Sequence, residues 1–135
     1  MIEMPLSDAS RRIRRVSLGD LLPRTALRHG ARTALVDGEQ RITYEQLDRR
    51  SSRFAHWLMG QLGSGQQIGM LCANSIDMVV ATHGIHKSGN VWVPVNIKLD
   101  AASIAYILQH AEVSAVVVDE ALHAVLGHAG AQGGE

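Results

Sequence analysis

The chain has 135 residues, of which 46% are hydrophobic, 19% charged and 4% aromatic, and its formal net charge is zero. This composition excludes an intrinsically disordered chain, which needs low hydrophobicity and a high net charge, and the single cysteine, Cys72, excludes a disulfide scaffold. No stretch reaches the roughly 18 uninterrupted apolar residues of a membrane span. Charged residues precede any apolar run at the N-terminus, which is untypical of a secretory signal. We therefore expect a soluble, cytoplasmic protein with one core and no membrane span.

Basic residues are concentrated in the first part of the chain. Residues 1–53 hold 11 arginines and 7 acidic residues, whereas residues 54–135 hold 2 lysines and 6 acidic residues. A cluster of arginines can bind nucleic acid or a membrane surface, but nucleic-acid sites usually add aromatic stacking platforms, and the aromatic residues here are scattered. We expect no nucleic-acid partner and a flexible N-terminal tail over residues 1–16, which carries Arg11, Arg12, Arg14 and Arg15.

The first expected elements are a helix and a hairpin. A helix is predicted from Asp20 to His29, because aspartate suits an N-cap, Pro23 falls in the first turn and a glycine follows the last residue. Two short β-prone runs, 33–36 and 40–43, then flank Asp37-Gly38, which is the strongest local signal for a β-hairpin.

A long helix is expected next. Thr43, followed three residues later by Gln46, forms a capping box and marks its start, and Gly63 marks its end. One face of this helix is apolar and carries Leu47, Phe54, Leu58 and Leu62, with Trp57 at its edge.

Three apolar runs alternate with helical segments in the rest of the chain. The predicted strands are Gln67–Ala73, Val91–Val95 and Val113–Val118, and the predicted helices are 76–87, 101–110 and 120–128. This alternation predicts right-handed βαβ crossovers and a parallel sheet. The expected fold class is therefore α/β, a partial Rossmann-like parallel sheet with flanking helices over residues 17–128, preceded by an N-terminal helix and β-hairpin. A frayed tail is expected at 129–135.

Candidate binding residues are few. The glycines at 60, 63, 65 and 69 follow a helix and open a strand, whereas a phosphate-binding glycine loop follows a strand and opens a helix. Asn74 and Ser75 are better placed, because they join a buried strand to a helix N-terminus, where anions bind. The alternative is that one of them simply caps the helix.

No catalytic or metal constellation stands out. His83 and His86 are three residues apart on one predicted helix, but no further ligand has suitable spacing. Cys72 lies in an apolar strand and is predicted to be a core thiol rather than a nucleophile. Trp57 and Trp92 are interpreted as core aromatics. We assign neither catalytic nor metal-binding residues.

Two stretches resemble the first two core motifs of the adenylate-forming superfamily, which includes acyl-CoA synthetases, luciferases and the adenylation domains of peptide synthetases. They are Arg41-Ile42-Thr43-Tyr44-Glu45-Gln46-Leu47 and His86-Lys87-Ser88-Gly89-Asn90-Val91-Trp92-Val93-Pro94-Val95-Asn96. The similarity continues around them and covers about residues 17–120. The chain thus resembles the N-terminal portion of such an enzyme. Asn96 favours the acyl-CoA synthetase branch, since peptide-synthetase domains more often have aspartate there.

The resemblance implies an enzyme that joins a carboxylic or fatty acid to ATP and passes the acyl group to CoA, with ATP, Mg²⁺ and CoA required by the full-length protein. The family's glycine-rich phosphate loop, adenine-binding segment, ribose-binding aspartate and catalytic lysine all follow the region that this chain resembles, and the sequence contains none of them. We therefore expect the chain to be inactive alone and to bind no cofactor by itself. Two turns depart from the family pattern, Gly65-Gln66 and Ser88-Gly89-Asn90.

Three functions remain open at this point. The chain is the N-terminal portion of an acyl-CoA synthetase-like protein, or it is an interaction module that pairs with a separately encoded remainder or with itself. The third alternative is a minimal nucleotide-binding domain that uses Asn74 and Ser75.

Overall fold

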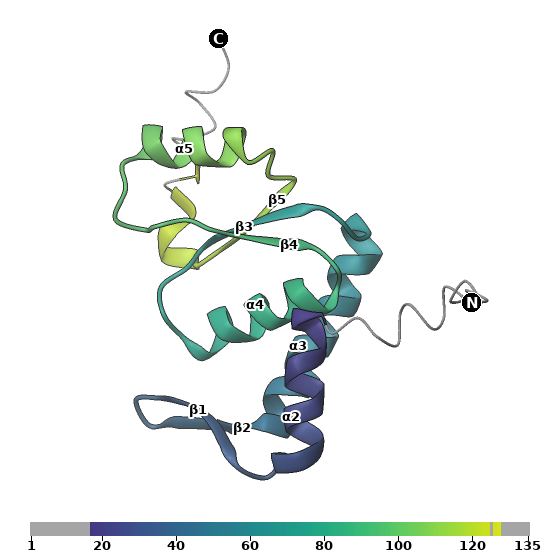
Figure 1. Cartoon of the computed structure of the whole chain (residues 1–135). Coiled ribbons are helices and arrows are strands. Elements are labelled where there is room, and N and C mark those ends of the chain that lie inside the picture. The colour runs from purple at the N-terminus through teal and green to yellow at the C-terminus, as the bar shows by residue number, and fades with distance from the viewer. Residues whose placement is uncertain (1–16, 125, 128–135) are drawn as a thin grey trace, which may run out of the picture.

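A computed structural model describes residues 17–124, 126 and 127. The arginine cluster, His128 and both expected tails lie outside these residues. In chain order the elements are η1 (Leu18–Asp20), α2 (Leu21–His29), β1 (Thr33–Asp37), β2 (Gln40–Thr43), α3 (Tyr44–Leu62), β3 (Gln67–Leu71), α4 (Ile76–Lys87), β4 (Val91–Pro94), α5 (Ala101–His110), β5 (Ala115–Val118) and η2 (Glu120–Leu122) (Figure 1).

The first helix begins differently from the prediction. Asp20 stands at the N-cap position of α2, but its side chain accepts no capping hydrogen bond from the helix. Its carboxylate instead accepts hydrogen bonds from the backbone N–H and the hydroxyl of Ser17, at 2.9 and 3.0 Å. These bonds close the short η1 turn, so the prediction that Asp20 caps the helix with its side chain is wrong. Pro23 lies in the first turn of α2, as expected.

The hairpin and the start of α3 are confirmed. Strands β1 and β2 pair antiparallel, and Gly38 has a φ of 58°, which glycine adopts without strain. Thr43 Oγ1 accepts from the backbone N–H of Gln46 at 3.2 Å, and Gln46 Oε1 accepts from the backbone N–H of Thr43 at 2.8 Å. This reciprocal capping box fixes the direction in which α3 leaves the hairpin.

The three remaining strands form a parallel sheet with the order β4-β3-β5. Strand β3 is therefore central, and its residues 68–71 are buried. Strand β4 ends at Pro94 as predicted, since proline cannot continue the hydrogen-bonded ladder. Strands β3 and β5 are each two residues shorter than predicted. The α/β fold class is confirmed.

Helices cover both faces of this sheet, and alternate residues of β3 face opposite layers (Figure 1). Ile68 and Met70 pack in a cluster with Leu58 of α3 and Ile85 of α4. On the opposite face, Leu71 packs with residues of α5 and of the segment that follows β5, namely Ile104, Ile107, Leu108, Leu122 and Leu126. A third cluster, Leu22, Leu47, Ile76 and Val80, joins α2 and the hairpin to the sheet domain.

The two tryptophans correct the sequence interpretation. The exposed fraction is 57% for Trp57 and 36% for Trp92, so neither is a core residue. Trp57 lies on the outer flank of α3, stacked on Phe54 with ring centroids 5.8 Å apart. Within the described residues, no helix is long and apolar enough to cross a membrane.

The expected last helix begins as the η2 turn, and residues 123, 124, 126 and 127 continue it as helix. Its predicted final residue, His128, lies outside the described part.

Candidate functional site

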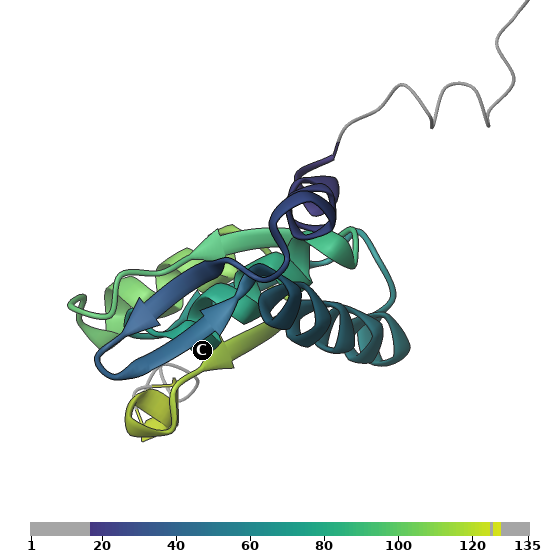
Figure 2. The ribbon, with the colours of Figure 1, turned by 90° about the horizontal axis from the view of Figure 1, so that it is seen from below.

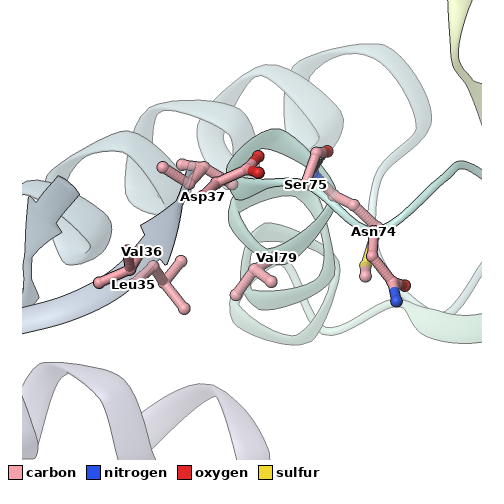
Figure 3. A pocket seen from close by; sticks show the side chains of 8 residues that line it. Leu35, Val36, Asp37, Asn74, Ser75 and Val79 are labelled. Atoms are coloured by element: carbon pink, nitrogen blue, oxygen red, sulfur yellow. Dashed lines mark hydrogen bonds between the residues drawn. The ribbon is translucent and has the colours of Figure 1, made fainter. Parts of the chain in front are cut away.

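The turn after β3 carries the two residues predicted to bind an anion. Ser75 Oγ accepts from the backbone N–H of Met78 at 3.1 Å, so its hydroxyl caps α4. Asn74 is exposed and lies beside it. Both line a hollow of about 420 Å³, and the hairpin forms its other wall with Leu35, Val36 and Asp37 (Figure 3). Sequence analysis did not assign the hairpin to this site, because nothing local signals that β1 folds back over α4.

Carboxylates surround this turn. Asp37 lines the hollow opposite Ser75, Asp77 stands in the first turn of α4 and pairs with Arg50, and Asp119 Oδ2 accepts from the backbone N–H of Ala73 at 2.6 Å. Negative charge near a helix N-terminus occupies the position that a bound anion would take. Anion binding at Asn74 and Ser75 therefore stays a prediction, and these charges weigh against a phosphate there.

A second hollow, of about 330 Å³, lies at the carboxyl ends of β3 and β4. It is lined by Cys72, Ala73, Asn74, Val95, Asn96, Ile97 and Lys98. Because α4 follows β3 on one face of the sheet and α5 follows β4 on the other, this is the switch point where ligands of open α/β sheets bind. It offers the Asn74 amide and the Lys98 ammonium group, and Asn96 Oδ1 accepts from the backbone N–H of Lys98 at 2.9 Å.

Lys98, Asn96 and Asp119 were not assigned as site residues from the sequence. A usable signal existed, since Asn96 and Asp119 directly follow strands predicted from the sequence, as Asn74 does.

Cys72 is half-buried at the edge of this second hollow. Burial, and then the nearby carboxylate of Asp119, raise the pKa of its thiol to about 11. The thiol contacts the Val117 carbonyl oxygen at 3.5 Å. It is therefore protonated at neutral pH and unsuited to nucleophilic attack, in keeping with the predicted structural role.

The two α4 histidines do not belong to a metal cluster among the described residues, which contain no group of three or more metal-ligating side chains. Burial lowers the pKa of His83 and of His86, and the positive charges of His86 and Lys87 lower the pKa of His83 further. The His86 ring meets Trp92 edge-on with centroids 6.1 Å apart. Both rings pack as neutral groups at neutral pH.

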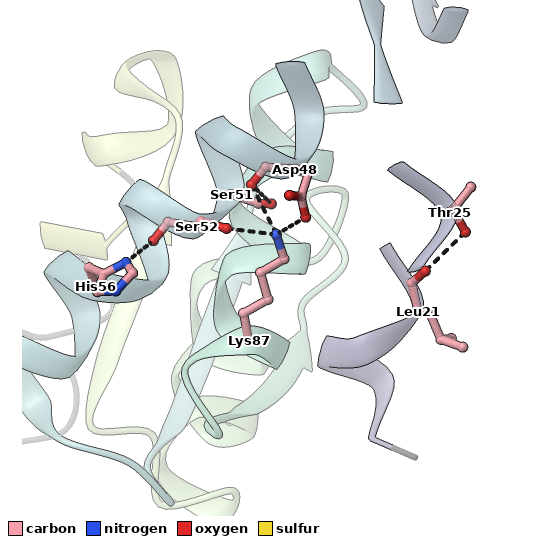
Figure 4. A network of polar contacts seen from close by, with 7 residues as sticks. All are labelled: Leu21, Thr25, Asp48, Ser51, Ser52, His56 and Lys87. Carbon is pink, nitrogen blue, oxygen red and sulfur yellow. Dashed lines mark hydrogen bonds and ion pairs between the residues drawn. The ribbon is translucent and has the colours of Figure 1, made fainter. Parts of the chain in front are cut away.

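Lys87, which opens the second core motif with His86, ties α4 to α3 (Figure 4). Its Nζ donates to Asp48 Oδ1 at 2.6 Å, to the Asp48 carbonyl oxygen at 2.9 Å and to Ser52 Oγ at 2.9 Å. The Lys87 side chain is only 9% exposed. All three donors of the ammonium group are used within the fold, so this lysine has no free proton for a ligand phosphate.

The turn Ser88-Gly89-Asn90 holds a second buried polar network. Asn90 Oδ1 accepts from the backbone N–H of Gln66 at 2.9 Å, and its amide donates to the Gly63 carbonyl at 3.1 Å and to Ser88 Oγ at 2.9 Å. Ser88 Oγ donates to the Ile85 carbonyl at 2.8 Å. These bonds lock the loop before β3 against the loop before β4. The turn Ser88-Gly89-Asn90, which departs from the superfamily pattern, thus stabilises the packing of these two loops. Both core motifs join neighbouring elements of the fold.

The sequence matches a known family. Residues 22–133 match the model of the AMP-binding enzyme family, and the chain belongs to that family. Tyrocidine synthase 2 of Brevibacillus parabrevis is 35% identical over 109 residues, which are 80% of this chain and 3% of that protein. The medium/long-chain-fatty-acid–CoA/3-oxocholest-4-en-26-oate–CoA ligase of Mycobacterium marinum is 34% identical over 87 residues, 64% of this chain and 16% of that protein.

A solved structure extends the match to three dimensions. The inhibitor-bound N-terminal domain of FACL13 from Mycobacterium tuberculosis superposes with a TM-score of 0.79 and 25% identity, covering 83% of this chain and 29% of that one. The resemblance to the N-terminal portion of an adenylate-forming enzyme is confirmed. The chain spans a small part of each of these relatives.

Proposed function

We propose that this chain supplies the N-terminal segment of an ATP-dependent acyl-CoA ligase, which activates a carboxylic acid as its acyl adenylate and transfers the acyl group to CoA. The observation that carries the proposal is the family match over residues 22–133, together with the superposition on an N-terminal ligase domain of which the chain covers 29%. ATP, Mg²⁺, CoA and the acid are then ligands of the complete enzyme, which acts in the cytoplasm.

The chain alone is inactive in this proposal. Acyl-adenylate formation needs positive charge and hydrogen-bond donors arranged around the transferred nucleotide phosphate. The two lysines of the sequence do not provide this arrangement, because Lys87 is tied to Asp48 and Ser52, and Lys98 stands at a separate strand end. The phosphate loop and catalytic lysine of the superfamily are absent from the sequence.

Activation of an amino acid is the second candidate reaction. Tyrocidine synthase 2 matches a larger share of the chain than the Mycobacterium marinum ligase does, at similar identity. Asn96 supports the acyl-CoA branch, because it stands where peptide-synthetase domains more often carry aspartate. We propose the acyl-CoA branch because of Asn96.

The experiment that separates these branches uses two chimeras. Residues 1–127 are joined to the part of the Mycobacterium marinum ligase that follows its matched segment, or to the part of tyrocidine synthase 2 that follows its matched segment, and ATP–pyrophosphate exchange is measured with fatty acids and with amino acids. Exchange by the ligase chimera alone supports the proposal. Exchange by the synthase chimera alone, or by neither folded chimera, contradicts it.

A minimal nucleotide binder is the remaining alternative, and it has a direct test. Chemical shifts of the chain alone are followed during titration with ATP and with AMP. The proposed function predicts no perturbation of residues 73–77 at millimolar nucleotide, whereas saturable shifts confined to those residues favour the nucleotide binder.

A further inference from the structure

Helix α2 and the η1 turn before it present leucines to solvent. Leu18 in η1 and Leu21 and Leu27 in α2 are exposed, and Leu27, at 88%, is the most exposed large apolar side chain of the described residues. Figure 2 shows this purple helix nearly end-on, at the periphery of the molecule. Single exposed leucines are ordinary on protein surfaces, whereas a group of them marks an interaction site.

The opposite side of α2 is anchored, so these leucines cannot turn inward. Leu22 is 4% exposed and packs with residues of α3 and α4. In η1, a Cβ atom added to Gly19 would lie 2.9 Å from the His86 carbonyl oxygen, because the turn rests directly on the end of α4. The outward side of α2 is therefore a fixed surface of the described fold.

Arginines share this outward side with the leucines. Two residues turn an α-helix by about 200°, so Arg24 points away from buried Leu22. The residues of α2 that are three or four positions from Arg24 lie within about 60° of it around the helix axis. They are Leu21, Leu27 and Arg28, and like Arg24 they are exposed. These four residues form what we call the leucine–arginine face.

The segment around this face is positively charged. Residues 21–36 contain three arginines and no acidic residue. Beside the face, the carboxylate of Asp20 closes the η1 turn and that of Asp48 pairs with Lys87. Glu45 contributes one exposed carboxylate next to α2, against the three arginines. An anionic surface therefore meets positive charge and apolar side chains at the same place.

We propose that the leucine–arginine face binds an anionic phospholipid surface. The leucine side chains enter the boundary between lipid headgroups and acyl chains, and each arginine lays its apolar stem along that boundary while its guanidinium group pairs with lipid phosphates. The arginines supply the attraction that an anionic leaflet exerts on basic segments. The chain lies on the membrane in this proposal and does not enter its core.

Two other occupants fit the face less well. A nucleic acid would leave the leucines in water, and the four residues of the face include no aromatic side chain on which bases stack. A second copy related by a two-fold axis would bring Arg24 and Arg28 of both copies together, and like charges repel. The proposal involves neither ATP nor an acid substrate, so it does not rest on the proposed function and fails or holds independently of it.

Vesicle cosedimentation of the full chain is the first test, with vesicles of phosphatidylcholine alone and of phosphatidylcholine with about 30% phosphatidylglycerol. The partition coefficient is expected to be about tenfold higher on the anionic vesicles and to fall as sodium chloride is raised. Failure to bind the anionic vesicles, or equal binding to both kinds, would overturn the proposal. Dimerisation without vesicle binding, measured by light scattering and abolished by Leu27→Gln, would assign the face to a second copy and also overturn it.

Replacing the two leucines tests the apolar part of the face. Leu21→Gln/Leu27→Gln should lower the partition coefficient on anionic vesicles about tenfold. The matched control Met59→Gln/Tyr106→Gln replaces two exposed apolar side chains of α3 and α5 and should lower it less than about twofold. Both variants change exposed positions, and circular dichroism checks that they stay folded. Equal losses in the two double variants would exclude this face.

Replacing the two arginines tests the charge of the face. Arg24→Gln/Arg28→Gln should lower the partition coefficient about tenfold. The control Arg49→Gln/Arg53→Gln removes the same charge from exposed positions of α3 and should lower it less than about threefold. A chain without residues 2–16, which hold four further arginines, should still bind the anionic vesicles. Loss of binding on this deletion, or equal effects of the two arginine variants, would contradict the proposal.

Discussion

Asn90 illustrates how single side chains hold this fold together. It is 7% exposed and bridges two loops through the backbone of Gly63 and Gln66. Gly63 has a φ of 75°, and neighbouring Gly65, with a φ of 78°, donates its backbone N–H to the Gly89 carbonyl. The amide of Asn90 therefore pairs further backbone groups of this loop, beside the backbone bonds of Gly65 with Gly89 and of Gln66 with Val91.

Replacing Asn90 with alanine should lower the free energy of unfolding by about 1–3 kcal/mol, because it removes three hydrogen bonds, two to part-buried backbone groups and one to the buried Ser88 hydroxyl. The matched control is Asn96→Ala, since Asn96 is exposed and bonds only the nearby Lys98 backbone; it should change stability by less than about 0.5 kcal/mol. Urea unfolding of both variants measures the difference. Equal stabilities would mean that the buried network contributes nothing.

His83 makes the stability of the protein depend on pH. Its pKa is lowered in the folded state by burial and then by His86 and Lys87, against the raising effect of Asp48. The unfolded chain therefore binds more protons below its histidine pKa of about 6.5, so the unfolding free energy falls as the pH drops from about 7.5 to about 5.5. The pKa shifts of Asp20 and Asp100 are also downward, and they act at lower pH because they concern carboxylates.

The test replaces His83 with glutamine and measures urea unfolding at both pH values. The variant should lose part of the pH dependence, and the double variant with His86→Gln should lose nearly all of it, because the pKa of His86 is lowered as well. A double variant that retains the full wild-type slope would show that other groups cause it.

At the scale of elements, the contact between α3 and α4 organises the molecule. Gly84 of α4 faces α3 so closely that a Cβ atom added there would lie 2.6 Å from Phe54 Cδ1 and 3.0 Å from the Ser51 carbonyl oxygen. Lys87, one turn further along, closes the same contact with its ion pair to Asp48. The superfamily's second motif thus begins at the end of a tightly packed helix pair.

Gly84→Ala should lower the unfolding free energy by about 1–2 kcal/mol, because overpacking outweighs the better helix propensity of alanine. Gly60→Ala in α3 should have the opposite sign and raise it by about 0.5–1 kcal/mol, since nothing lies within 4 Å of its added Cβ. Thermal unfolding of both variants measures these two changes in stability. A stabilising Gly84→Ala would contradict the close helix contact.

The ion pair of Lys87 with Asp48 should contribute more to the free energy of unfolding than the exposed ion pair of Arg50 with Asp77. Lys87→Met is expected to cost about 2 kcal/mol, because it leaves Asp48, which is 29% exposed, without its partner. Arg50→Met should cost less than about 1 kcal/mol, because Arg50 and Asp77 are 41% and 84% exposed. Chemical denaturation of each variant and of the Lys87/Asp48 double-variant cycle measures the coupling. Similar losses at the two sites would contradict a structural role for Lys87.

Local signals predicted these elements well. The caps at Thr43 and Ser75 each depend on a partner three residues away, and both side chains form the bonds that the sequence analysis considered for them. The predicted cap at Asp20 did not form because the backbone N–H of Ser17, three residues before it, donates to the Asp20 carboxylate instead. Contacts between distant segments gave no local signal: Lys87 meets Asp48 and Asn90 meets Gly63 across 39 and 27 residues.

At the scale of the whole molecule, the fold class followed from the alternation of apolar runs and helical segments. The misplacement of Trp57 and Trp92 has a different cause. A tryptophan on an apolar helix face or strand is normally buried, and here part of each ring remains exposed. An apolar hollow of about 400 Å³ lies between α3 and β5 and is lined by Trp57, which explains why this side chain makes apolar contacts and yet stays 57% exposed.

The most direct test of the account is ATP–pyrophosphate exchange by the purified 135-residue chain, with Mg²⁺ and a panel of fatty acids. The account predicts no exchange above that of a heat-denatured sample, since the sequence lacks the phosphate loop and the catalytic lysine of the superfamily. Exchange that is abolished by denaturation and survives repurification would contradict the claim that this segment needs the rest of a ligase to act.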